Sequence, residues 1–322
     1  MVPISSRKSS HTRLEFLSLW RSWVALLSPR NTLSQLIAFL LLPRPLNGLI
    51  TALSVGVGLW TANAPPTWGP GLIAALSAAL INGAGNAFND LIDIDIDRIN
   101  RPDRPLPSGR ISPFVAGVQT LALTLAGCLL GFWLSPWHGS IALGVALLLA
   151  LYSIFLKNSL LWGNILVAFV GALAFPYGAL AAGDLGRSWI PALFALLFHI
   201  GREIVKDIED VAGDRLRGDH TLPLRWGRNR AGWIAAAVYL LLLAIAWIRF
   251  FTGLYGAAYA LALAPVNGLV IYVLVQLYSR HAHPDNAAKI AAERNDHRLG
   301  RLLKIGMFLG LLAVVLGELG FD

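Results

Sequence analysis

The sequence predicts an all-α integral membrane protein with nine transmembrane helices. Of the 322 residues, 56% are hydrophobic and only 14% are charged, whereas soluble domains carry about 25% charged residues. Apolar blocks recur along the chain at roughly 20 residues, the length at which a helix crosses a bilayer. The Lys and Arg residues between these blocks alternate between many and few, as they do when successive loops face opposite sides of a membrane.

The apolar blocks are predicted to be helices because a chain inside lipid must satisfy its own backbone hydrogen bonds, which only helices and closed β-barrels achieve. Strands of membrane barrels alternate polar and apolar residues over about 10 residues, and the blocks here are longer and continuously apolar. In chain order, the nine predicted spans cover residues 45–62, 69–92, 112–134, 138–156, 161–182, 188–206, 230–252, 255–279 and 299–320.

Short connections with Pro or Gly separate several of these spans. The first, third and fifth spans are followed by Ala64-Pro65-Pro66, Ser135-Pro136-Trp137 and Ala182-Gly183-Asp184, respectively. Such residues favour turns and end helices. The second and sixth spans run instead into acidic segments, which makes those two connections candidates for function.

The basic residues predict the orientation of the bundle. With the N-terminus in the cytoplasm, 24 of the 26 Lys and Arg residues fall on the cytoplasmic face, and only Arg187 and Arg249 fall on the other. This is the positive-inside pattern, so the net charge of +8 indicates contact with anionic headgroups rather than with nucleic acid. The long polar connections 93–111, 207–229 and 280–298 lie on the same face, where we expect the active-site loops.

Residues 1–40 are predicted to form a polar, basic arm that is flexible or lies on the membrane surface, and residues 41–322 to form the transmembrane domain. The arm lacks the apolar stretch and cleavage site of a signal peptide. Cys128 is the only cysteine, so no disulfide or thiolate metal cluster is expected within one chain. We expect a protein of the cell (inner) membrane, in contact with membrane lipids and without an obligate protein partner.

Two acidic segments share one spacing. Positions i, i+4, i+7 and i+11 are occupied by Asn86, Asp90, Asp93 and Asp97 in the first row and by Glu203, Asp207, Asp210 and Asp214 in the second. On a helix of 3.6 residues per turn these offsets form one stripe, and Asp95 and Glu209 fall outside it. Because the rows end spans four apart, they predict an internal repeat with both stripes at one membrane depth.

Carboxylates at the end of a membrane span are costly and are functional candidates by default. Two facing acidic rows would repel each other without a cation between them, and hard oxygen ligands suit Mg²⁺, which is commonly shared with a phosphorylated substrate. Nearby Arg and Lys side chains would contact the phosphate oxygens. The alternative is that each row is a solvated surface loop, and the matched spacing argues against it.

The first row belongs to a longer pattern that resembles the first signature of the UbiA superfamily of intramembrane prenyltransferases. That pattern reads Asn89-Asp90-x-x-Asp93-x-x-x-Asp97-x-x-Asn100-Arg101-Pro102-x-Arg104-Pro105-Leu106-Pro107-Ser108-Gly109. The second row, Asp207-x-x-Asp210-x-x-x-Asp214, is similar to the second aspartate motif of the superfamily. The resemblance runs from about Arg44 to the C-terminus. It implies a nine-helix bundle around a central cavity open to lipid, and Mg²⁺-dependent transfer of a prenyl group from a prenyl diphosphate donor to a lipophilic acceptor.

The resemblance also implies residue roles. The metal-binding set is Asn89, Asp90, Asp93, Asp97, Asp207, Asp210 and Asp214. The diphosphate-binding set is Arg44, Asn47, Tyr152, Lys157, Arg101, Arg104, Arg202 and Lys206. The residues expected to be catalytic are Asp93, Asp97, Asp210, Asp214 and Lys157. For Lys157 the alternative is a basic residue that only fixes the span in the membrane.

The segment from Gly201 to Asp210, followed by Thr221-Leu222-Pro223, is most similar to the digeranylgeranylglyceryl phosphate synthase branch. Enzymes of that branch add a geranylgeranyl group to the free hydroxyl of geranylgeranylglyceryl phosphate. Acceptors of the 4-hydroxybenzoate, homogentisate, naphthoate and chlorophyllide types stay open, because those branches share much of the first signature.

The expected mechanism is dissociative: diphosphate leaves, an allylic cation forms in a water-poor cavity, and the acceptor attacks C1. The acceptor's proton passes to a carboxylate or to diphosphate. An acceptor that itself carries a phosphate needs a second cationic pocket, for which the candidates are Arg202, Lys206, Arg101 and Arg104.

Two rival functions are less well supported. Membrane phosphotransferases that move a phosphoalcohol also use metal-binding aspartates, but their Asp-Gly-x-x-Ala-Arg pattern is missing here. An ion-coupled transporter would also pair acidic helices from two repeats. Its binding site would lie at the bilayer midplane, whereas the acids here cluster at the basic ends of the spans.

Overall fold

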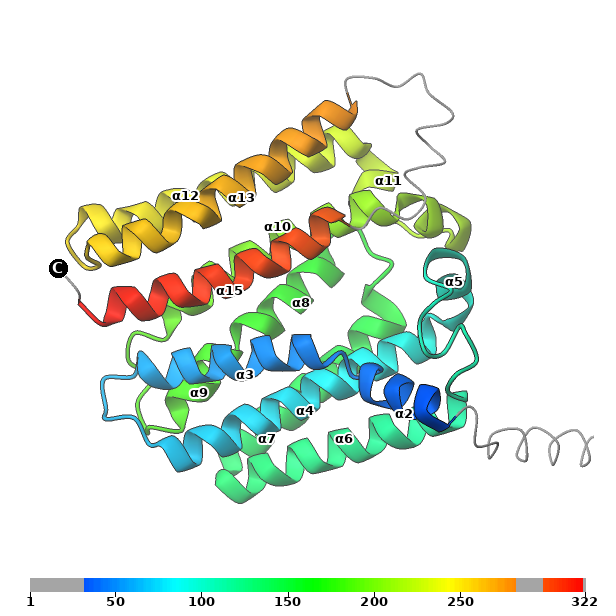
Figure 1. Cartoon of the computed structure of the whole chain (residues 1–322), viewed down its shortest axis with the longest axis horizontal. Coiled ribbons are helices and arrows are strands. Elements are labelled where there is room, and N and C mark those ends of the chain that lie inside the picture. Colours follow the sequence, from blue (N-terminus) through cyan, green and yellow to red (C-terminus); the bar gives the residue numbers. More distant parts are fainter. Residues whose placement is uncertain (1–31, 282–297, 321–322) are drawn as a thin grey trace, which may run out of the picture.

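The computed structural model describes residues 32–281 and 298–320, and within these ranges every regular element is a helix (Figure 1). The longer helices run side by side, with α12 and α13 at one edge of the bundle and α6 at the opposite edge (Figure 1). The elements, in chain order, are α2 (Thr32–Leu41), α3 (Pro45–Trp60), α4 (Trp68–Ile92), α5 (Ile94–Asn100), α6 (Pro113–Leu134), α7 (Pro136–Leu151), the π-helical turn η1 (Tyr152–Leu156), α8 (Trp162–Ala172), α9 (Ala174–Leu180), α10 (Trp189–Arg217), α11 (Leu222–Trp226), α12 (Arg228–Phe251), α13 (Ala257–His281) and α15 (Arg298–Glu318).

The prediction of an all-helical protein with membrane-spanning segments is confirmed. Eight helical segments in the described ranges are long and apolar enough to cross a bilayer. They cover eight of the nine predicted spans, and the segment left out is α10, which was predicted to span over residues 188–206. The part of α10 predicted to span ends with Arg202, Glu203 and Lys206, so its composition is less apolar than that of the other eight.

The first predicted span begins earlier in the structure than the sequence suggested. Residues 32–40 of the predicted N-terminal arm belong to α2, and α2 and α3 together form a candidate span of 29 residues from Thr32 to Trp60. α2 buries Ala38 against Leu106 and Ile111 of the connection that follows α5. The rest of the predicted arm, residues 1–31, lies outside the described ranges.

The fifth predicted span is two helices, α8 and α9, which meet at Leu173. Pro176 lies in the first turn of α9. Because proline has no N–H and its ring clashes with the carbonyl four residues earlier, a single straight helix through this position is disfavoured. The break turns α9 against α3.

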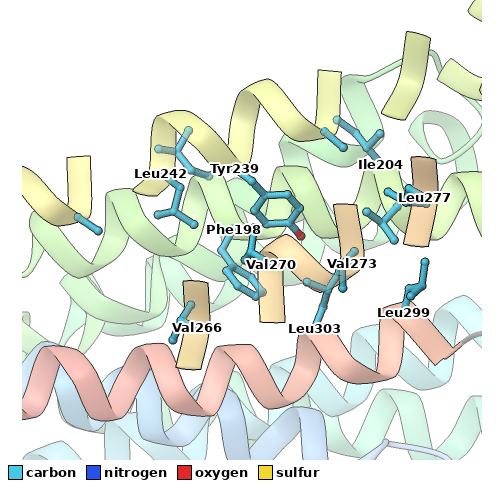
Figure 2. Packing of buried hydrophobic residues seen from close by; sticks show 14 of the residues in the cluster. Phe198, Ile204, Tyr239, Leu242, Val266, Val270, Val273, Leu277, Leu299 and Leu303 are labelled. Atoms are coloured by element: carbon cyan, nitrogen blue, oxygen red, sulfur yellow. The ribbon is translucent and has the colours of Figure 1, made fainter. Parts of the chain in front are cut away.

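The largest apolar cluster lies where α10, α12, α13 and α15 meet (Figure 2). Tyr239 of α12 is fully buried there, and its ring packs edge-to-face on Phe198 of α10 at 5.7 Å between centroids. The outer surface is apolar as well: Trp133, Phe251 and Leu261 are each more than 70% exposed. Since soluble proteins rarely expose such extended apolar surface, these outer faces are suited to lipid.

Helices α3 and α9 approach so closely that each has a glycine at the contact. A Cβ added to Gly58 would lie 1.9 Å from the carbonyl oxygen of Phe175, and one added to Gly178 would lie 1.9 Å from that of Val55. Small residues of this kind let membrane helices bring their backbones together. The contact fixes α3, which carries several polar residues of the site, against the middle of the bundle.

Substituting Gly58→Ala is therefore expected to destabilise the folded protein by about 3 kcal/mol, the scale of forcing extra atoms into a packed contact. Gly56→Ala is the matched control, because a Cβ at Gly56, on the same helix, meets no atom within 4 Å. Thermal unfolding of both variants in detergent measures the difference. Equal stability of the two variants would contradict the close contact of α3 with α9.

Candidate active site

The first acidic row crosses the junction of α4 and α5 rather than lying on one uninterrupted helix. α4 ends at Ile92, Asp93 is the junction residue, and α5 begins at Ile94. The backbone hydrogen bonds Asp93 N to Asn89 O (3.0 Å) and Asp97 N to Asp93 O (2.8 Å) continue through the junction. The row therefore keeps nearly helical spacing, and its side chains still lie along one stripe across the junction.

Asp90 and Asp97 face the same arginine. Arg104 contacts Asp90 at 3.0 Å and Asp97 at 2.5 Å, and Asp90 also pairs with Arg44. Both carboxylates are almost fully buried, where an unpaired charge would be very costly. Arg44, at the start of α3, has a left-handed backbone with φ 55°, a conformation that costs about 1 kcal/mol for a residue other than glycine.

Burial raises the pKa of Asp97, and the pairing with Arg104 opposes this shift without cancelling it. For Arg104 burial lowers the pKa, but the carboxylates of Asp90 and Asp97 outweigh it and raise the pKa overall. Arg104 therefore stays charged, and the ionised form of Asp97 is favoured by any further positive charge placed next to it.

Asp93 pairs with Lys157, whose backbone lies directly after η1. The N–H of Lys157 donates to the carbonyl of Tyr152, five residues earlier, at 2.9 Å. A turn this wide brings Tyr152 and Lys157 toward the same side of the chain, and π-turns of this kind are frequent at functional sites. The amide of Asn89 donates to Asp93 as well, at 2.8 Å.

The second acidic row lies within the single long helix α10. Asp207 accepts a hydrogen bond from the side chain of Asn164 at 2.8 Å, and Asp214 accepts one from Thr221 at 3.3 Å. Glu203 is buried and pairs with both Arg202 and Lys206, the latter at 3.1 Å.

An ion pair joins the two rows. Arg101, in the first signature, contacts both carboxylate oxygens of Asp210 in the second row, at 3.2 and 3.1 Å. Tyr152 of η1 lines the same cavity as Arg101 of the first signature and Lys206 of α10. The prediction that both rows lie at the same end of the bundle agrees with this geometry.

A cavity of about 360 Å³ extends from this polar region into the bundle. Seven cationic side chains and two carboxylates line its polar part, namely Arg44, Arg101, Arg104, Arg202, Lys206, Arg301, Lys304, Glu203 and Glu209. Aliphatic side chains line the remainder, among them Ile81, Val145, Leu149 and Val170. One end of the cavity is suited to an anion and the other to a hydrocarbon chain.

The predicted residues divide into those that line the cavity and those behind them. Arg44, Asn47, Asn89, Arg101, Arg104, Tyr152, Arg202 and Lys206 line it. Lys157 and the predicted metal-binding aspartates of both rows are not part of its lining. Asp90, Asp93, Asp97 and Asp210 each pair with an Arg or Lys, and Asp207 and Asp214 are hydrogen-bonded to Asn164 and Thr221. Within the described ranges, no three Asp, Glu, His or Cys side chains come close enough to hold a metal ion by themselves.

Asp95 and Glu209, which the spacing places outside the two rows, have different surroundings in the structure. The side chain of Asp95 is 87% exposed and pairs with Arg98, as expected for a residue on the far side of the helix. Glu209 instead accepts hydrogen bonds from the backbone N–H groups of Leu299 and Gly300, at 3.0 and 3.2 Å. It therefore caps the N-terminus of α15.

Sequence reasoning did not assign Lys304 and Arg301 of α15 to the site, although both line the cavity. The available signal was their separation of three residues at the start of an apolar run, which puts them on one helix face. His199 of α10 lines the cavity too. Its Nδ1 atom is buried and has no hydrogen-bond partner among the described residues, and a Cβ at Gly171 would lie 2.9 Å from its Nε2.

Comparison with known proteins agrees with this arrangement. The model of the UbiA prenyltransferase family matches residues 49–295. The digeranylgeranylglyceryl phosphate synthase of Methanothermobacter thermautotrophicus is 35% identical over 247 residues, which cover 77% of this chain and 84% of that protein. The enzyme of the same name from Methanosarcina mazei is 38% identical over 240 residues, covering 74% and 78%.

Solved structures share the fold. A structure of digeranylgeranylglyceryl phosphate synthase superposes with a TM-score of 0.65 at 29% identity, covering 88% of this chain and 99% of that one. A UbiA homologue from Archaeoglobus fulgidus bound to GPP and Mg²⁺ superposes with a TM-score of 0.64 at 20% identity, covering 87% and 98%. With the family model matching over three quarters of the sequence, the chain belongs to the UbiA prenyltransferase family and is an integral membrane prenyltransferase.

Proposed function

We propose that this prenyltransferase moves a geranylgeranyl group from geranylgeranyl diphosphate to the free hydroxyl of geranylgeranylglyceryl phosphate, with Mg²⁺ as cofactor. The observation that carries the proposal is the pairing of Arg101 with Asp210 at 3.1 Å. It brings the two acidic rows together at the cationic end of a cavity whose other end is apolar. The named relatives from two methanogens support this acceptor over the aromatic ones.

The donor set fits Mg²⁺. The two rows offer carboxylate and amide oxygens, and Mg²⁺ in proteins is commonly held by one or two carboxylates together with the phosphates of the substrate. We assign metal binding to Asn89, Asp90, Asp93, Asp97, Asp207, Asp210 and Asp214. Bound there, Mg²⁺ would neutralise charge on the departing diphosphate.

The cationic side chains at the cavity are assigned to the diphosphate. Arg44, Arg101, Arg104, Arg202 and Lys206 line the cavity, and Lys157 lies beside them through its pair with Asp93. They would hold the phosphate oxygens by charge-assisted hydrogen bonds, with Asn47 and Tyr152 as neutral neighbours. The aliphatic wall holds the prenyl chain and keeps water away from C1 while the C1–O bond breaks.

The acceptor oxygen then forms the new bond to C1. Its proton goes to diphosphate or to a carboxylate of the two rows, so the products are the ether, diphosphate and one proton. Fixed cations that stabilise the charge on the leaving group lower the barrier because they need no rearrangement during the reaction.

The arrangement in the membrane completes the proposal. We infer that α10 is the ninth span, because it is 29 residues long and packs between spans on both sides. We further propose that the protein lies in the cell membrane with its N-terminus and both acidic rows on the cytoplasmic side, as the distribution of Lys and Arg suggests.

In the test, purified protein in detergent is incubated with radiolabelled geranylgeranyl diphosphate, Mg²⁺ and one of four acceptors. The acceptors are geranylgeranylglyceryl phosphate, 4-hydroxybenzoate, homogentisate and a chlorophyllide. We expect product with the glycerol lipid alone, loss of product when EDTA removes the metal, and its return when Mg²⁺ is added back. Product with an aromatic acceptor alone would overturn the acceptor and leave the transfer chemistry intact.

A further inference from the structure

We propose that Lys304 and Arg301, near the start of α15, form the binding site for the phosphate of the acceptor. The inference rests on the proposed function and adds to it residues that recognise the second substrate. Both side chains line the cavity, and neither belongs to the two acidic signatures.

Lys304 lies beside the residues assigned to the diphosphate without being one of their ion pairs. Its Nζ donates to Oδ1 of Asn47 at 2.9 Å. Asn47 in turn contacts Asn86, and Asn86 contacts Arg44 at 3.4 Å. Lys304 therefore contacts α3 directly and α4 through one further polar contact, next to the place where the donor is activated.

Charge balance distinguishes this pair from the other cations of the cavity. Arg44, Arg101, Arg104, Arg202 and Lys206 each pair with a carboxylate. In the described part of the chain, no ion pair includes Lys304 or Arg301. Arg202, Arg44, Lys206 and Arg101, all of them cations, line the same cavity as Lys304. A partly buried ammonium among four like charges creates a local excess of positive charge, which an anion would relieve.

Glu209 fixes the position of this pair. Its carboxylate accepts the backbone N–H groups of Leu299 and Gly300, so the first turn of α15 is held against α10. Glu209 also lines the cavity, but it is engaged with the positive end of the helix and forms no ion pair with Lys304. The capped turn presents Arg301 and Lys304 to the same cavity wall.

The chemistry of the acceptor requires an anion site at this place. Because glycerol has only three carbons, the phosphate and the free hydroxyl are on neighbouring or next-neighbouring carbons. When the hydroxyl reaches C1 of the donor, the acceptor phosphate therefore lies close to the donor diphosphate. Two anions held side by side repel each other unless each has its own cations, and those of α15 are not committed to the diphosphate.

The apolar tail of the acceptor has space along the same helix. A second, smaller cavity of about 80 Å³ lies next to the first and shares Ile50, Ser54, His199 and Met307 with it. Gly306 and Gly310 of α15, two and six residues beyond Lys304, line it together with Met307. A phosphate at Lys304 would thus place a hydrocarbon chain against an apolar wall.

The test compares Lys304→Gln with the unaltered protein, using geranylgeranylglyceryl phosphate and the same lipid without its phosphate. We expect the substitution to raise KM for the phosphorylated acceptor at least tenfold and to leave KM for geranylgeranyl diphosphate within twofold. With the unphosphorylated acceptor, both proteins are expected to be equally poor. Lys304→Arg should recover most of the loss, and Arg301→Gln should show a smaller change of the same kind because Arg301 is exposed.

Arg230→Gln is the matched control, since Arg230 is an exposed cation of α12 that does not line the cavity; its kinetics should not change. A rise in donor KM, or an equal loss with both acceptors, would overturn the inference. If Lys304→Gln does not fold, an unchanged KM for the phosphorylated acceptor in Arg301→Gln would overturn the inference. If the unaltered protein transfers nothing to the glycerol lipid, the proposed function fails instead, and this inference fails with it.

Discussion

Substituting Asp93→Ala should lower turnover by roughly a thousandfold, which is the scale of loss when a group that stabilises developing charge is removed. Asp93 is almost fully buried at the junction of α4 and α5, paired with Lys157 and hydrogen-bonded to Asn89. Removing it takes away an assigned metal ligand and leaves Lys157 without its partner carboxylate. Initial rates at saturating donor, acceptor and Mg²⁺ measure the effect.

Asp95→Ala is the control for this experiment. Asp95 is two residues away in the same acidic segment, but its side chain is exposed and pairs with Arg98. Exposed pairs of this kind contribute little to stability, so near-normal turnover is expected. Retained activity in Asp93→Ala, with a normal elution profile in detergent, would remove Asp93 from the metal-binding set.

Substituting Asp210→Ala is also expected to lower turnover by roughly a thousandfold, because Asp210 has two roles. Asp210 is the assigned metal ligand of the second row that also holds Arg101. Its loss frees Arg101 to bind phosphate more tightly while weakening the metal, so kcat should fall more than the affinity for the donor. Asp210→Asn preserves the volume and removes the charge, and it should be nearly as slow.

A fall in donor affinity with kcat preserved would contradict this assignment. It would mean that Asp210 serves only to orient Arg101. Arg101→Gln, measured in parallel, separates the two cases: it should weaken donor binding in a protein that keeps both acidic rows.

The sequence predicted the helices well because lipid permits few alternatives. The third predicted span, residues 112–134, corresponds to α6, Pro113–Leu134, within one residue. The predicted fifth span missed its break at Leu173, since Pro176 in an apolar run was not weighed as a helix breaker. Length and hydropathy alone identify the eight confirmed segments as candidate spans. Because α10 is charged in its second half, its assignment as a span depends on how it packs against the other helices.

The site was predictable where it depends on local spacing and obscure where it depends on contacts between distant segments. The stripe formed by Asp90, Asp93 and Asp97 follows from helical periodicity. The pairing of Arg101 with Asp210, 109 residues apart, depends on how the connection after α5 folds over α10. Lys304 was missed because a lysine at the start of an apolar run also serves as a contact for lipid headgroups.

The pairing of assigned metal ligands with assigned phosphate-binding cations has a thermodynamic consequence. Arg101 contacts both carboxylate oxygens of Asp210 through Nη2, so a metal at Asp210 competes with Arg101 for these oxygens, and a phosphate at Nη2 competes with Asp210. If only the metal or only the diphosphate binds, one of the two side chains loses part of its ion pair. If both bind, Asp210 contacts the metal and Arg101 contacts the phosphate, so each keeps a partner of opposite charge. On the roles proposed above, donor and divalent ion therefore increase each other's affinity by the same factor, and each binds weakly to the protein by itself.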